Sequence, residues 1–446
     1  MRSYVPNTLK ERNEMLKEIG VDSVDGLFSD ISSNLRLNRT LAIGEDGVGL
    51  SELEIRRVFK AYADSNQELP LFRGAGAYRH YIPAIVPQIV SRSELYTAYT
   101  PYQAEMSQGM LQAIFEFQTF VCALTGLDAA NASVYDGATA AAETMHMVCD
   151  VKRKKKVLVS AGLHPDVLTT MKTYARFSGI EIVVIPLNRD GSTDIYSLEA
   201  NLRDSAGLFV AVPNFYGVIE DADKFSAMAH ENNALMIEYV NPISLGAIKR
   251  PKDIGADIAI GDGQTLGIPI SFGGPYVGFM SCTSKLMRNL PGRIVGQTAD
   301  AEGNRAFVLT LQAREQHIRR EKASSNICSN QMLCAIMSSI YLACMGKEGM
   351  KEVADQNIQK AHYLMDGLTN VCGMTLRYNA PFFNEFVTDS AIPGSEINDI
   401  LKEKGFIGGL PLSRLFPGDN GVLWCATECN TRDEIDALIG ALEVKA

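Results

Sequence analysis

The segment GADIAIGDGQTLGIPISFGGP, residues 255–275, carries the pattern on which the fold prediction rests. Its apolar run at 258–260 predicts a short buried strand. A small polar loop containing Gln264 follows, and Gly273-Gly274-Pro275 indicates a return turn. In open parallel sheets, ligands bind beyond the carboxyl ends of the strands. The loop around Gln264 is therefore the first place to look for a functional site.

Runs like this one recur along the middle of the chain, and several of the intervening segments have the length and pattern of helices. Such alternation predicts a mainly parallel sheet that helices cover on both faces. The predicted strands are KVLVS (156–160), IEIVVIP (180–186), GLFVAVP (207–213), ALMIEYV (234–240), DIAIG (257–261) and YVGFMS (276–281).

The flanking regions differ from this core. The start of the chain is charged and helical in pattern, and a Gly-, Pro- and Tyr-rich stretch then precedes a helix that runs from about Glu105 to Gly126. After about Asn330, a long helix leads into mixed strand and helix patterns. We therefore predict an N-terminal helical extension (1–75), a large α/β domain (76–330) and a small α+β domain (331–446).

Composition excludes several functional classes. The chain has 446 residues, a net charge of −10 and no apolar run long enough to span a membrane, so nucleic-acid and membrane partners are not expected. Its nine cysteines and six histidines show no metal-ligand spacing, which favours reduced thiols, no metal and a cytoplasmic location. The run KRKKK (152–156) lies at a predicted helix end, where the helix dipole favours cations.

The large α/β domain followed by a small domain suits the pyridoxal-phosphate-dependent transferase fold of the aspartate-aminotransferase type (fold type I). That fold uses an acid for the pyridine nitrogen, a lysine for the Schiff base and a helix N-terminus for the phosphate. Here Glu238 lies on one strand, and Gln264 stands where the lysine is needed. A glutamine amide cannot form an imine, so this pocket cannot perform Schiff-base chemistry alone.

The phosphate position is altered as well. The sequence VYDGATAAAE (134–143) predicts a helix start, with Asp136 as the N-cap over amides that reach to Thr139. A capping carboxylate would occupy those amides and repel a phosphate. Taken singly, Glu238 fits a surface or capping acid and Gln264 fits an ordinary loop residue. The interpretation as a degenerate cofactor pocket rests on the three positions occurring in order.

Longer segments carry a resemblance that covers nearly the whole chain. The chain resembles the alpha subunit of the split form of glycine decarboxylase, the P-protein family of the glycine cleavage system. The segments that match best are YTAYTPYQAEMSQGMLQAIFEFQTFVCALTGLDAANASVYDGATAAAE (96–143), EYVNPISLGAIKRPKDIGADIAIGDGQTLGIPISFGGPYVGFM (238–280) and PGRIVGQTADAEGNRAFVLTLQAREQHIRREKASSNICSNQ (291–331).

The resemblance implies a function for the missing lysine. In this family a beta subunit keeps the lysine and binds pyridoxal phosphate, whereas the alpha subunit has Gln-Thr at that place, here Gln264-Thr265. The implied reaction decarboxylates glycine and transfers the aminomethyl group to the lipoyl arm of the H-protein. The implied assembly is α2β2, in which this chain completes its partner's site and contains no catalytic residue of its own.

Candidates for completing the partner's site lie in the Gly- and Tyr-rich stretch. Tyr99, Thr100, Tyr102 and Gln103 offer hydroxyls and an amide, although a tyrosine cluster is also typical of interface packing. Arg73, His80 and Tyr81 could face a carboxylate or phosphate, although His80 also fits a packed histidine. The segment REQHIRREKASSN (314–326) is a rival anion site through Arg314, His317, Arg319 and Arg320, or a salt-bridged surface helix.

Two other hypotheses remain open from the sequence. The chain could be an autonomous pyridoxal enzyme, such as a desulfurase or decarboxylase, that uses Lys249 or Lys285. It could also be a regulatory or scaffold protein that retains the fold without catalysis. Neither lysine occupies the turn after the strand at 257–261, which disfavours the first of these alternatives.

Overall fold

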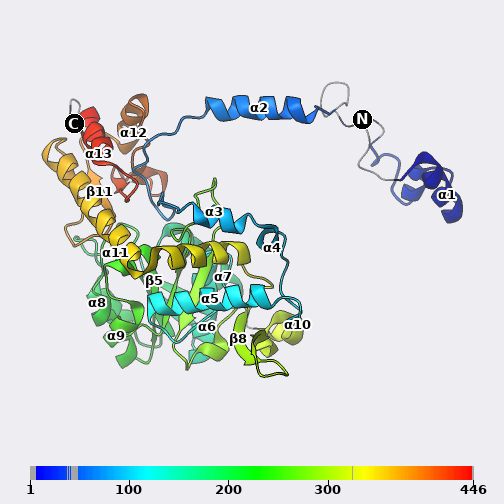
Figure 1. Ribbon diagram of the computed structural model, residues 1–446. Helices are drawn as coiled ribbons and strands as arrows, with labels where there is room; N and C mark the ends of the chain where they lie inside the picture. The colour runs from blue at the N-terminus through cyan, green and yellow to red at the C-terminus, as the bar shows by residue number, and fades with distance from the viewer. Residues whose placement is uncertain (1–6, 38, 40, 42–48, 324, 444–446) are drawn as a thin grey trace. The chain divides into compact units, whose positions relative to one another are not determined.

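The computed structural model describes residues 7–37, 39, 41, 49–323 and 325–443. It divides the chain into two compact parts, Met1–Glu68 and Leu69–Ala446. The first part contains helices α1 (Leu9–Ile19) and α2 (Glu52–Ser65). Each begins at a capping box, in which Thr8 or Ser51 and a glutamate three residues later satisfy each other's backbone amides. The remaining elements belong to the second part, coloured from cyan-blue to red in Figure 1.

The large sheet of the second part has seven strands in the order β1-β7-β6-β5-β4-β2-β3. Strands β2 to β6 run parallel, whereas β7 is antiparallel to β6 and β1 is antiparallel to β7. Every strand predicted in this region is confirmed. Their bounds are β1 Ala129–Ala130, β2 Lys156–Ser160, β3 Glu181–Ile185, β4 Gly207–Val212, β5 Leu235–Val240, β6 Ile258–Asp262 and β7 Gly278–Cys282.

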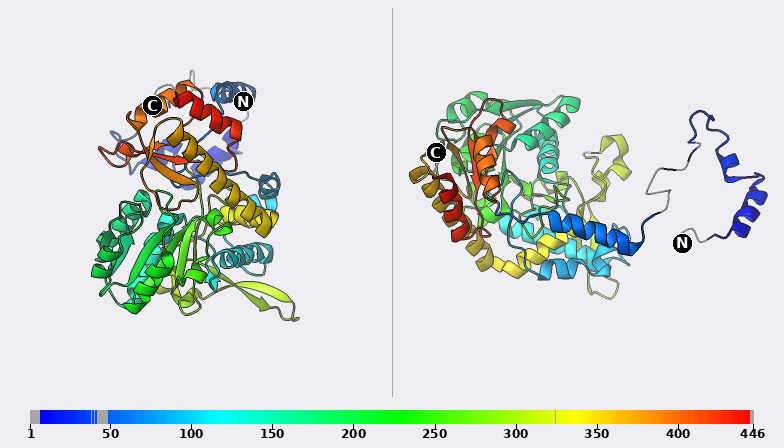
Figure 2. Two further views of the ribbon diagram at one scale, coloured as in Figure 1. Left: turned by 90° about the vertical axis from the view of Figure 1, so that its left-hand side faces the viewer. Right: turned by 90° about the horizontal axis from the view of Figure 1, so that it is seen from above.

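Alternate residues of these strands bury opposite faces of the sheet. In β4, Phe209 packs with α6 (Gly137–Lys152) and α7 (Pro165–Ser178), whereas Leu208 and Val210 pack with α8 (Ile195–Asn201) and α9 (Ala222–Glu231). Figure 2 shows the resulting layers, with helices on either side of the green strands. The predicted three-layer architecture is therefore confirmed, and the carboxyl ends of β4, β5 and β6 stay open for a site.

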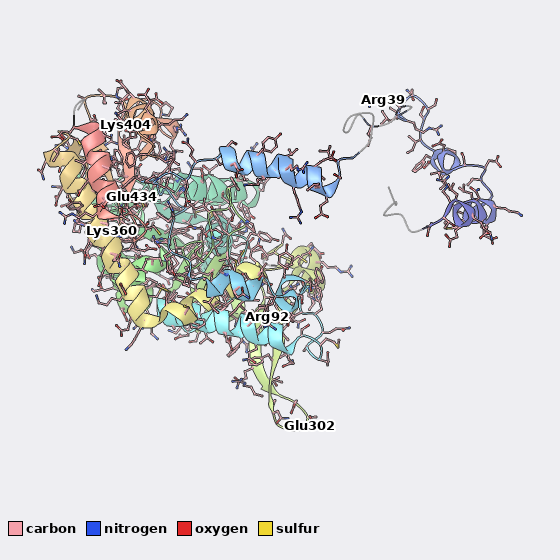
Figure 3. All side chains as sticks on the ribbon, turned by 45° about the horizontal axis from the view of Figure 1, so that its top comes forward. Arg39, Arg92, Glu302, Lys360, Lys404 and Glu434 are labelled. Atoms are coloured by element: carbon pink, nitrogen blue, oxygen red, sulfur yellow. The ribbon has the colours of Figure 1, made fainter. Side chains whose placement is uncertain are left out.

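Helix α5 (Gln108–Thr125) packs along the long helix α11 (Met332–Asn370). Gly126 ends α5 in the left-handed conformation, as predicted. Gly346 breaks α11 into two helical stretches with a φ of 58°, which a residue without Cβ adopts readily. A hairpin of β8 (Ile294–Ala299) and β9 (Arg305–Thr310) follows the large sheet, with Glu302 at its tip (Figure 3).

The small sheet is antiparallel, in the order β10-β11-β13-β12, and lies above the large sheet in the left view of Figure 2. Its buried core is centred on Trp424. The elements are β10 Thr375–Leu376, β11 Glu385–Asp389, α12 Gly394–Glu403, β12 Leu410–Pro411, β13 Val422–Cys425 and α13 Arg432–Leu442. Short helices complete the second part: α3 Ile85–Val90, α4 Ser93–Tyr96 and α10 Gln316–Arg319. Among the described residues, no helix has both the length and the apolar character that crossing a membrane requires.

Candidate functional site

A cavity of about 60 Å³ lies at the carboxyl ends of β4, β5 and β6. This is the place that the parallel topology predicts for a ligand. Residues at the ends of the three strands and directly after them form most of its wall, and Gly76 and Tyr78 also line it. The lining consists of Gly76, Tyr78, His164, Ala211, Pro213, Asn214, Phe215, Tyr239, Val240, Asn241, Pro242, Asp262, Gln264 and Thr265.

Gln264 lines this cavity and is 2% exposed. Its side-chain oxygen accepts a hydrogen bond from the backbone N–H of Tyr78 at 2.8 Å, and its Nε2 donates to the carbonyl of Tyr78 at 2.9 Å. The same Nε2 also donates to the carbonyl of Ile268 at 2.9 Å. The amide is therefore fully engaged in joining two chain segments, which no lysine ammonium could do because it accepts no hydrogen bond.

The N-terminus of α6 faces the same region. Asp136 caps the helix and accepts from the N–H of Thr139 at 2.7 Å, so the predicted N-cap is confirmed. A second carboxylate, that of Asp262, accepts from the N–H of Gly137 at 3.0 Å. The hydroxyl of Tyr239 stands where a Cβ on Gly137 would lie. Two of the chain's own carboxylates thus hold helix amides that would otherwise be available to a phosphate.

Asp262 is the acidic group of this cavity. Burial raises its pKa to about 7, and the nearby Asp136 acts in the same direction, while N–H donation from Gly137 and Gln264 opposes the shift. No sequence argument singled out Asp262, although its place two residues before Gln264 was a usable signal. An acid at the end of a strand, beside a glycine-led helix start, is in position to bond the helix amides.

Glu238 lies elsewhere than the degenerate-pocket interpretation expects. It is the fourth of six residues in β5, and β5 pairs it with Val210, which belongs to the face covered by α8 and α9. Strand alternation therefore turns its side chain away from Tyr239 and the cavity. Glu238 is 1% exposed, and burial, followed by the charge of Asp223, raises its pKa to about 8. Glu238 is therefore not among the residues that line the cavity, whereas its neighbour Tyr239 is.

Residues 72–81, called here the clasp segment, cross between the two sheets. Tyr78 donates its hydroxyl to Glu385 of β11 at 2.7 Å, and the N–H of Ala75 donates to the other oxygen of Glu385 at 2.6 Å. Burial raises the pKa of Glu385 to about 7. Arg73 donates to the carbonyls of Gly408 and Gly409 at 3.2 and 3.1 Å. Every one of these partners belongs to this chain, so Arg73 fastens the clasp segment.

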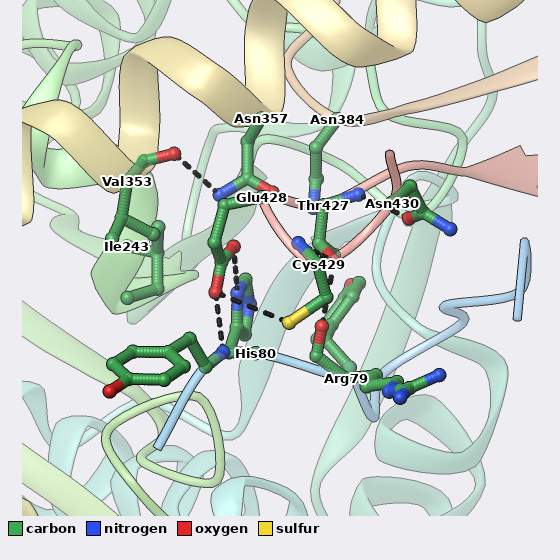
Figure 4. A network of polar contacts seen from close by, with 12 residues as sticks. Arg79, His80, Ile243, Val353, Asn357, Asn384, Thr427, Glu428, Cys429 and Asn430 are labelled. Carbon is green, nitrogen blue, oxygen red and sulfur yellow. Dashed lines mark hydrogen bonds and ion pairs between the residues drawn. The ribbon is translucent and has the colours of Figure 1, made fainter. Parts of the chain in front are cut away.

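His80 is fastened in the same way (Figure 4). Its Nδ1 lies 2.8 Å from Glu428 Oε2, and the N–H of Tyr81 donates to Oε1 of the same carboxylate at 2.6 Å. Burial opposes ionisation of Glu428, but hydrogen bonding and the charge of His80 outweigh it and hold the pKa of Glu428 below its usual range. Lys360 donates to the carbonyl of Glu428. His80 does face a carboxylate, and that carboxylate comes from residue 428 of this chain.

Four of the six residues expected in the partner's site, all but Arg73 and His80, lie together on residues 99–103. The rings of Tyr99 and Tyr102 are 6.2 Å apart between centroids, and both are largely exposed. Thr100 Oγ1 lies 3.5 Å from Ser329 Oγ, and Gln103 is exposed. Tyr102 also covers the guanidinium of Arg293, which sequence reasoning missed. That these residues complete a partner's site stays a prediction.

The rival anion site does not form one continuous helix. Residues 312–322 fold as three short turns, with α10 between two 3₁₀ turns. His317 lies 3.4 Å from Glu315, and Arg319 donates to the carbonyl of Ala313 at 3.2 Å. Arg320 has a positive φ of 54°. The side chain of Arg314 lies outside the described part of the structure.

The two lysines of the alternative hypothesis lie away from the cavity. Lys249 forms an exposed ion pair with Asp223 at 2.9 Å, and Lys285 is exposed. Within the described ranges, no lysine lines the cavity and no group of three potential metal ligands occurs. Lys154 and Lys156 of the KRKKK run donate to backbone carbonyls at 201–205.

The cavity residues do not fit pyridoxal phosphate, since they offer no amine and the amides of Gly137 and Thr139 at the start of α6 are occupied.

Comparisons with known proteins show the family of the chain. The family model described as glycine cleavage system P-protein matches residues 2–442. The chain is 49% identical over 442 residues to "Probable glycine dehydrogenase (decarboxylating) subunit 1" of Moorella thermoacetica, with 99% of each chain covered. The protein of the same name from Bacillus mycoides is 47% identical over 447 residues, again with 99% of each chain covered.

Solved structures give the same result for the fold. The crystal structure of glycine decarboxylase (P-protein) of the glycine cleavage system, in inhibitor-bound form, matches with a TM-score of 0.91 and 40% identity over 99% of this chain and 100% of that one. A cysteine desulfurase from Thermococcus onnurineus matches with a TM-score of 0.62 at 15% identity, over 84% of this chain and 94% of that one, and shows a shared fold alone. The predicted pyridoxal-phosphate-dependent transferase fold is confirmed. The chain belongs to the glycine cleavage system P-protein family, as a subunit 1 of glycine dehydrogenase (decarboxylating).

Proposed function

We propose that this chain is the cofactor-free subunit of the enzyme and that a lysine-bearing beta subunit holds pyridoxal phosphate. Together the two subunits decarboxylate glycine and transfer its aminomethyl group to the lipoyl arm of the H-protein. The single observation that carries the proposal is the side-chain amide of Gln264, which forms two hydrogen bonds with the backbone of Tyr78. It replaces the required amine with a group that cannot form an imine.

The helix amides support the same assignment. Pyridoxal phosphate would place its phosphate at the N-terminus of α6, where Asp136 and Asp262 already accept from Thr139 and Gly137. A phosphate there would meet two carboxylates at short range, and like charges in a buried site repel strongly. The absence of the lysine and the occupied phosphate site are two separate features, and each of them disfavours pyridoxal phosphate in this chain's own cavity.

The role left to this chain is positioning. The clasp segment ties the large sheet to the small sheet through Gln264, Glu385 and Glu428. The aromatic residues Tyr96, Tyr99 and Tyr102 and the thioether side chain of Met106 remain exposed beside it along the chain. Exposed aromatic clusters of this type are enriched at protein interfaces. We assign this surface to contact with the beta subunit in an α2β2 assembly, where its hydroxyls would border the partner's site and help to exclude water from it.

The autonomous-enzyme hypothesis is the second candidate function. It requires an amine in the cavity, and Lys249 instead pairs with Asp223 on the surface. We place the subunit in the cytoplasm, because none of the nine cysteines forms a disulfide and a reducing compartment keeps thiols in that state.

Borohydride trapping tests the proposal. The chain alone, the lysine-bearing partner alone and the assembled pair are each incubated with pyridoxal phosphate, reduced and analysed by mass spectrometry. The expected result is a stoichiometric adduct on the partner only, with glycine–CO2 exchange that requires both chains. A stoichiometric adduct on one lysine of this chain would overturn the proposal and favour an autonomous enzyme.

A further inference from the structure

Arg293 is a buried cation without an anionic partner in the described structure. Its side chain is 5% exposed, and both Nε and Nη1 are buried without a hydrogen-bond acceptor. Its Nη2 donates to the hydroxyl of Tyr102 at 3.3 Å, and the guanidinium carbon lies 5.0 Å from the centroid of the Tyr102 ring. Among the described residues, no carboxylate lies within ion-pair distance of it.

The backbone around Arg293 is firmly held. Its carbonyl accepts from the N–H of Ala132 at 2.7 Å, and the carbonyl of Pro291 accepts from the side chain of Asn131 at 3.0 Å. Gly292, with a φ of 80°, turns the chain between these contacts, and β8 begins one residue after Arg293. The backbone that carries the Arg293 side chain is therefore held by contacts on both sides of it, unlike that of an arginine on a mobile surface loop.

The other arginines of the chain show what Arg293 lacks. Arg377 is also largely buried and donates to the carboxylates of both Asp389 and Asp419. Arg305 resembles Arg293 in lying over an aromatic ring, that of Phe307 at 5.5 Å, but Arg305 is exposed to water. A buried charge without a counter-charge is strongly unfavourable, and one stacked ring offsets only part of that cost.

Tyr102 is the natural cover of this group. Tyr102 is 56% exposed, so its ring contacts the guanidinium while much of the residue faces water. The Tyr102 N–H bonds only locally, to the carbonyl of Thr100 at 2.9 Å. A change in the position of this ring would expose Nε and Nη1 without disturbing the backbone that holds Arg293.

We propose that Arg293 binds an oxyanion that arrives when the beta subunit assembles with this chain, and that Tyr102 then moves aside. The inference rests on the proposed function. The planar guanidinium matches the oxygens of phosphates and carboxylates alike. Two sources supply such a group at the assembled site, namely the phosphate of the cofactor and the carboxylate of glycine.

The test uses the assembled pair with Arg293→Met or Arg293→Lys in this chain. Arg305→Met is the matched control, because it also removes an arginine from an aromatic ring but from an exposed position. Three quantities are measured: the Kd for pyridoxal phosphate from its absorbance band, the KM for glycine, and the Kd of subunit association by sedimentation. If Arg293 binds the phosphate, Arg293→Met should raise the Kd for pyridoxal phosphate by about tenfold to a hundredfold. If it binds the carboxylate of glycine, the substitution should raise the KM for glycine by that factor. Arg293→Lys keeps the charge and is expected to lose less.

Two results would overturn the inference. If neither the cofactor Kd nor the KM changes by more than twofold, Arg293 is a structural cation. If only subunit association weakens, Arg293 binds a side chain of the partner. If Arg293→Met does not fold, the same measurements are made on Arg293→Lys and Tyr102→Phe. Tyr102→Phe removes the phenol hydroxyl and frees Nη2 of Arg293, so it should not weaken oxyanion binding. Failure of the proposed function is distinguishable, because it would appear as an adduct on this chain in the unsubstituted pair.

Discussion

Gln264 and Tyr78 are joined by two hydrogen bonds of opposite direction, one of 2.8 Å to the side-chain oxygen and one of 2.9 Å from the side-chain nitrogen. The pair connects the loop after β6 to the clasp segment across 186 residues of chain. A side-chain amide accepts at its oxygen and donates from its nitrogen, so it can pair with the N–H and the carbonyl of one residue at once. The residue that stands at the lysine position therefore acts as a structural link between segments.

Gln264→Lys is expected to destabilise the isolated chain. The introduced ammonium can donate to the carbonyl of Tyr78 but leaves the Tyr78 N–H without its acceptor, and it places a charge in a buried site. We expect the free energy of unfolding to fall by about 2 kcal/mol or more in urea denaturation. Gln297→Lys, at an exposed position of β8, is the control and should change stability by no more than about 0.5 kcal/mol.

The same variant should not gain cofactor chemistry. Because Asp136 and Asp262 still hold the amides of α6, pyridoxal phosphate and borohydride are expected to leave no stoichiometric adduct at position 264. A full adduct there would show that the amine alone was missing and that the carboxylates do not exclude the phosphate.

Asp136→Ala tests the occupied helix end directly. The substitution removes the acceptor of the Thr139 N–H, and loss of an N-cap lowers the free energy of unfolding by about 1 kcal/mol. Asp136→Asn keeps a capping oxygen and should recover most of that loss. Equal destabilisation by the two variants would mean that the negative charge, and not the hydrogen bond, stabilises α6.

Much of the fold could be predicted because its signals are local. The strand at 258–262 begins with the apolar run 258–260, and the helix after Asp136 begins with a cap in the sequence itself. The side of the sheet that Glu238 faces was not predictable in the same way. It follows from the register of β5 beside β4, which pairs Glu238 with Val210, and register is a property of two strands together.

Glu238→Gln is expected to change how stability depends on pH. Burial raises the pKa of Glu238 to about 8, whereas the unfolded chain has the ordinary value near 4.5. The folded state thus holds a proton that the unfolded state releases, so this group's contribution is fully present below pH 4.5 and is lost as pH rises through 8. Relative to wild type, Glu238→Gln should gain up to about 1.4 kcal/mol for each pH unit in that interval.

Urea denaturation at pH 5.5, 6.5 and 7.5 measures this slope. The pH dependence of the difference between variant and wild type is informative even if the introduced amide of Gln at position 238 finds no hydrogen-bond partner. A missing hydrogen bond lowers the free energy of unfolding by the same amount at all three pH values. Glu231→Gln is the control, because Glu231 is an exposed glutamate at the end of α9. The free energy of unfolding of this variant should depend on pH as that of wild type does. A flat difference between Glu238→Gln and wild type would place the pKa of Glu238 near its ordinary value.

His80 and Glu428 should be energetically coupled. They are 2.8 Å apart, and both side chains are almost fully buried, so removing either leaves a buried polar partner. We expect His80→Asn and Glu428→Gln each to cost about 3 kcal/mol, with a coupling of about 1 kcal/mol or more in a double-mutant cycle. The pair His230 and Asp257, at 2.9 Å but more exposed, is the control, with a coupling below about 1 kcal/mol.

The functional residues that the sequence could not reveal are joined by contacts over long stretches of chain. Glu385 and Glu428 meet the clasp segment from more than 300 residues away, and neither lies in a recognisable motif. Arg293 lies within a segment that resembles the family, yet only its burial beside Tyr102 distinguishes it from other arginines. From residue type, His80 could face a carboxylate or a phosphate or be a packed histidine, and only the fold shows that it pairs with Glu428.

Tyr99→Ser tests the surface that we assign to the beta subunit. Tyr99 is 79% exposed, so the substitution should leave the stability of the isolated chain within about 0.5 kcal/mol of wild type. If the ring is buried on assembly, association with the lysine-bearing partner should weaken by about tenfold or more, since interface tyrosines are common hot spots. Tyr196→Ser is the matched control, because Tyr196 is 80% exposed on α8, and it should leave association unchanged. Sedimentation of the mixed subunits measures both. Equal effects of the two substitutions would remove residues 96–106 from the interface, while a loss at Tyr99 alone, with the chain still folded, would locate the contact there.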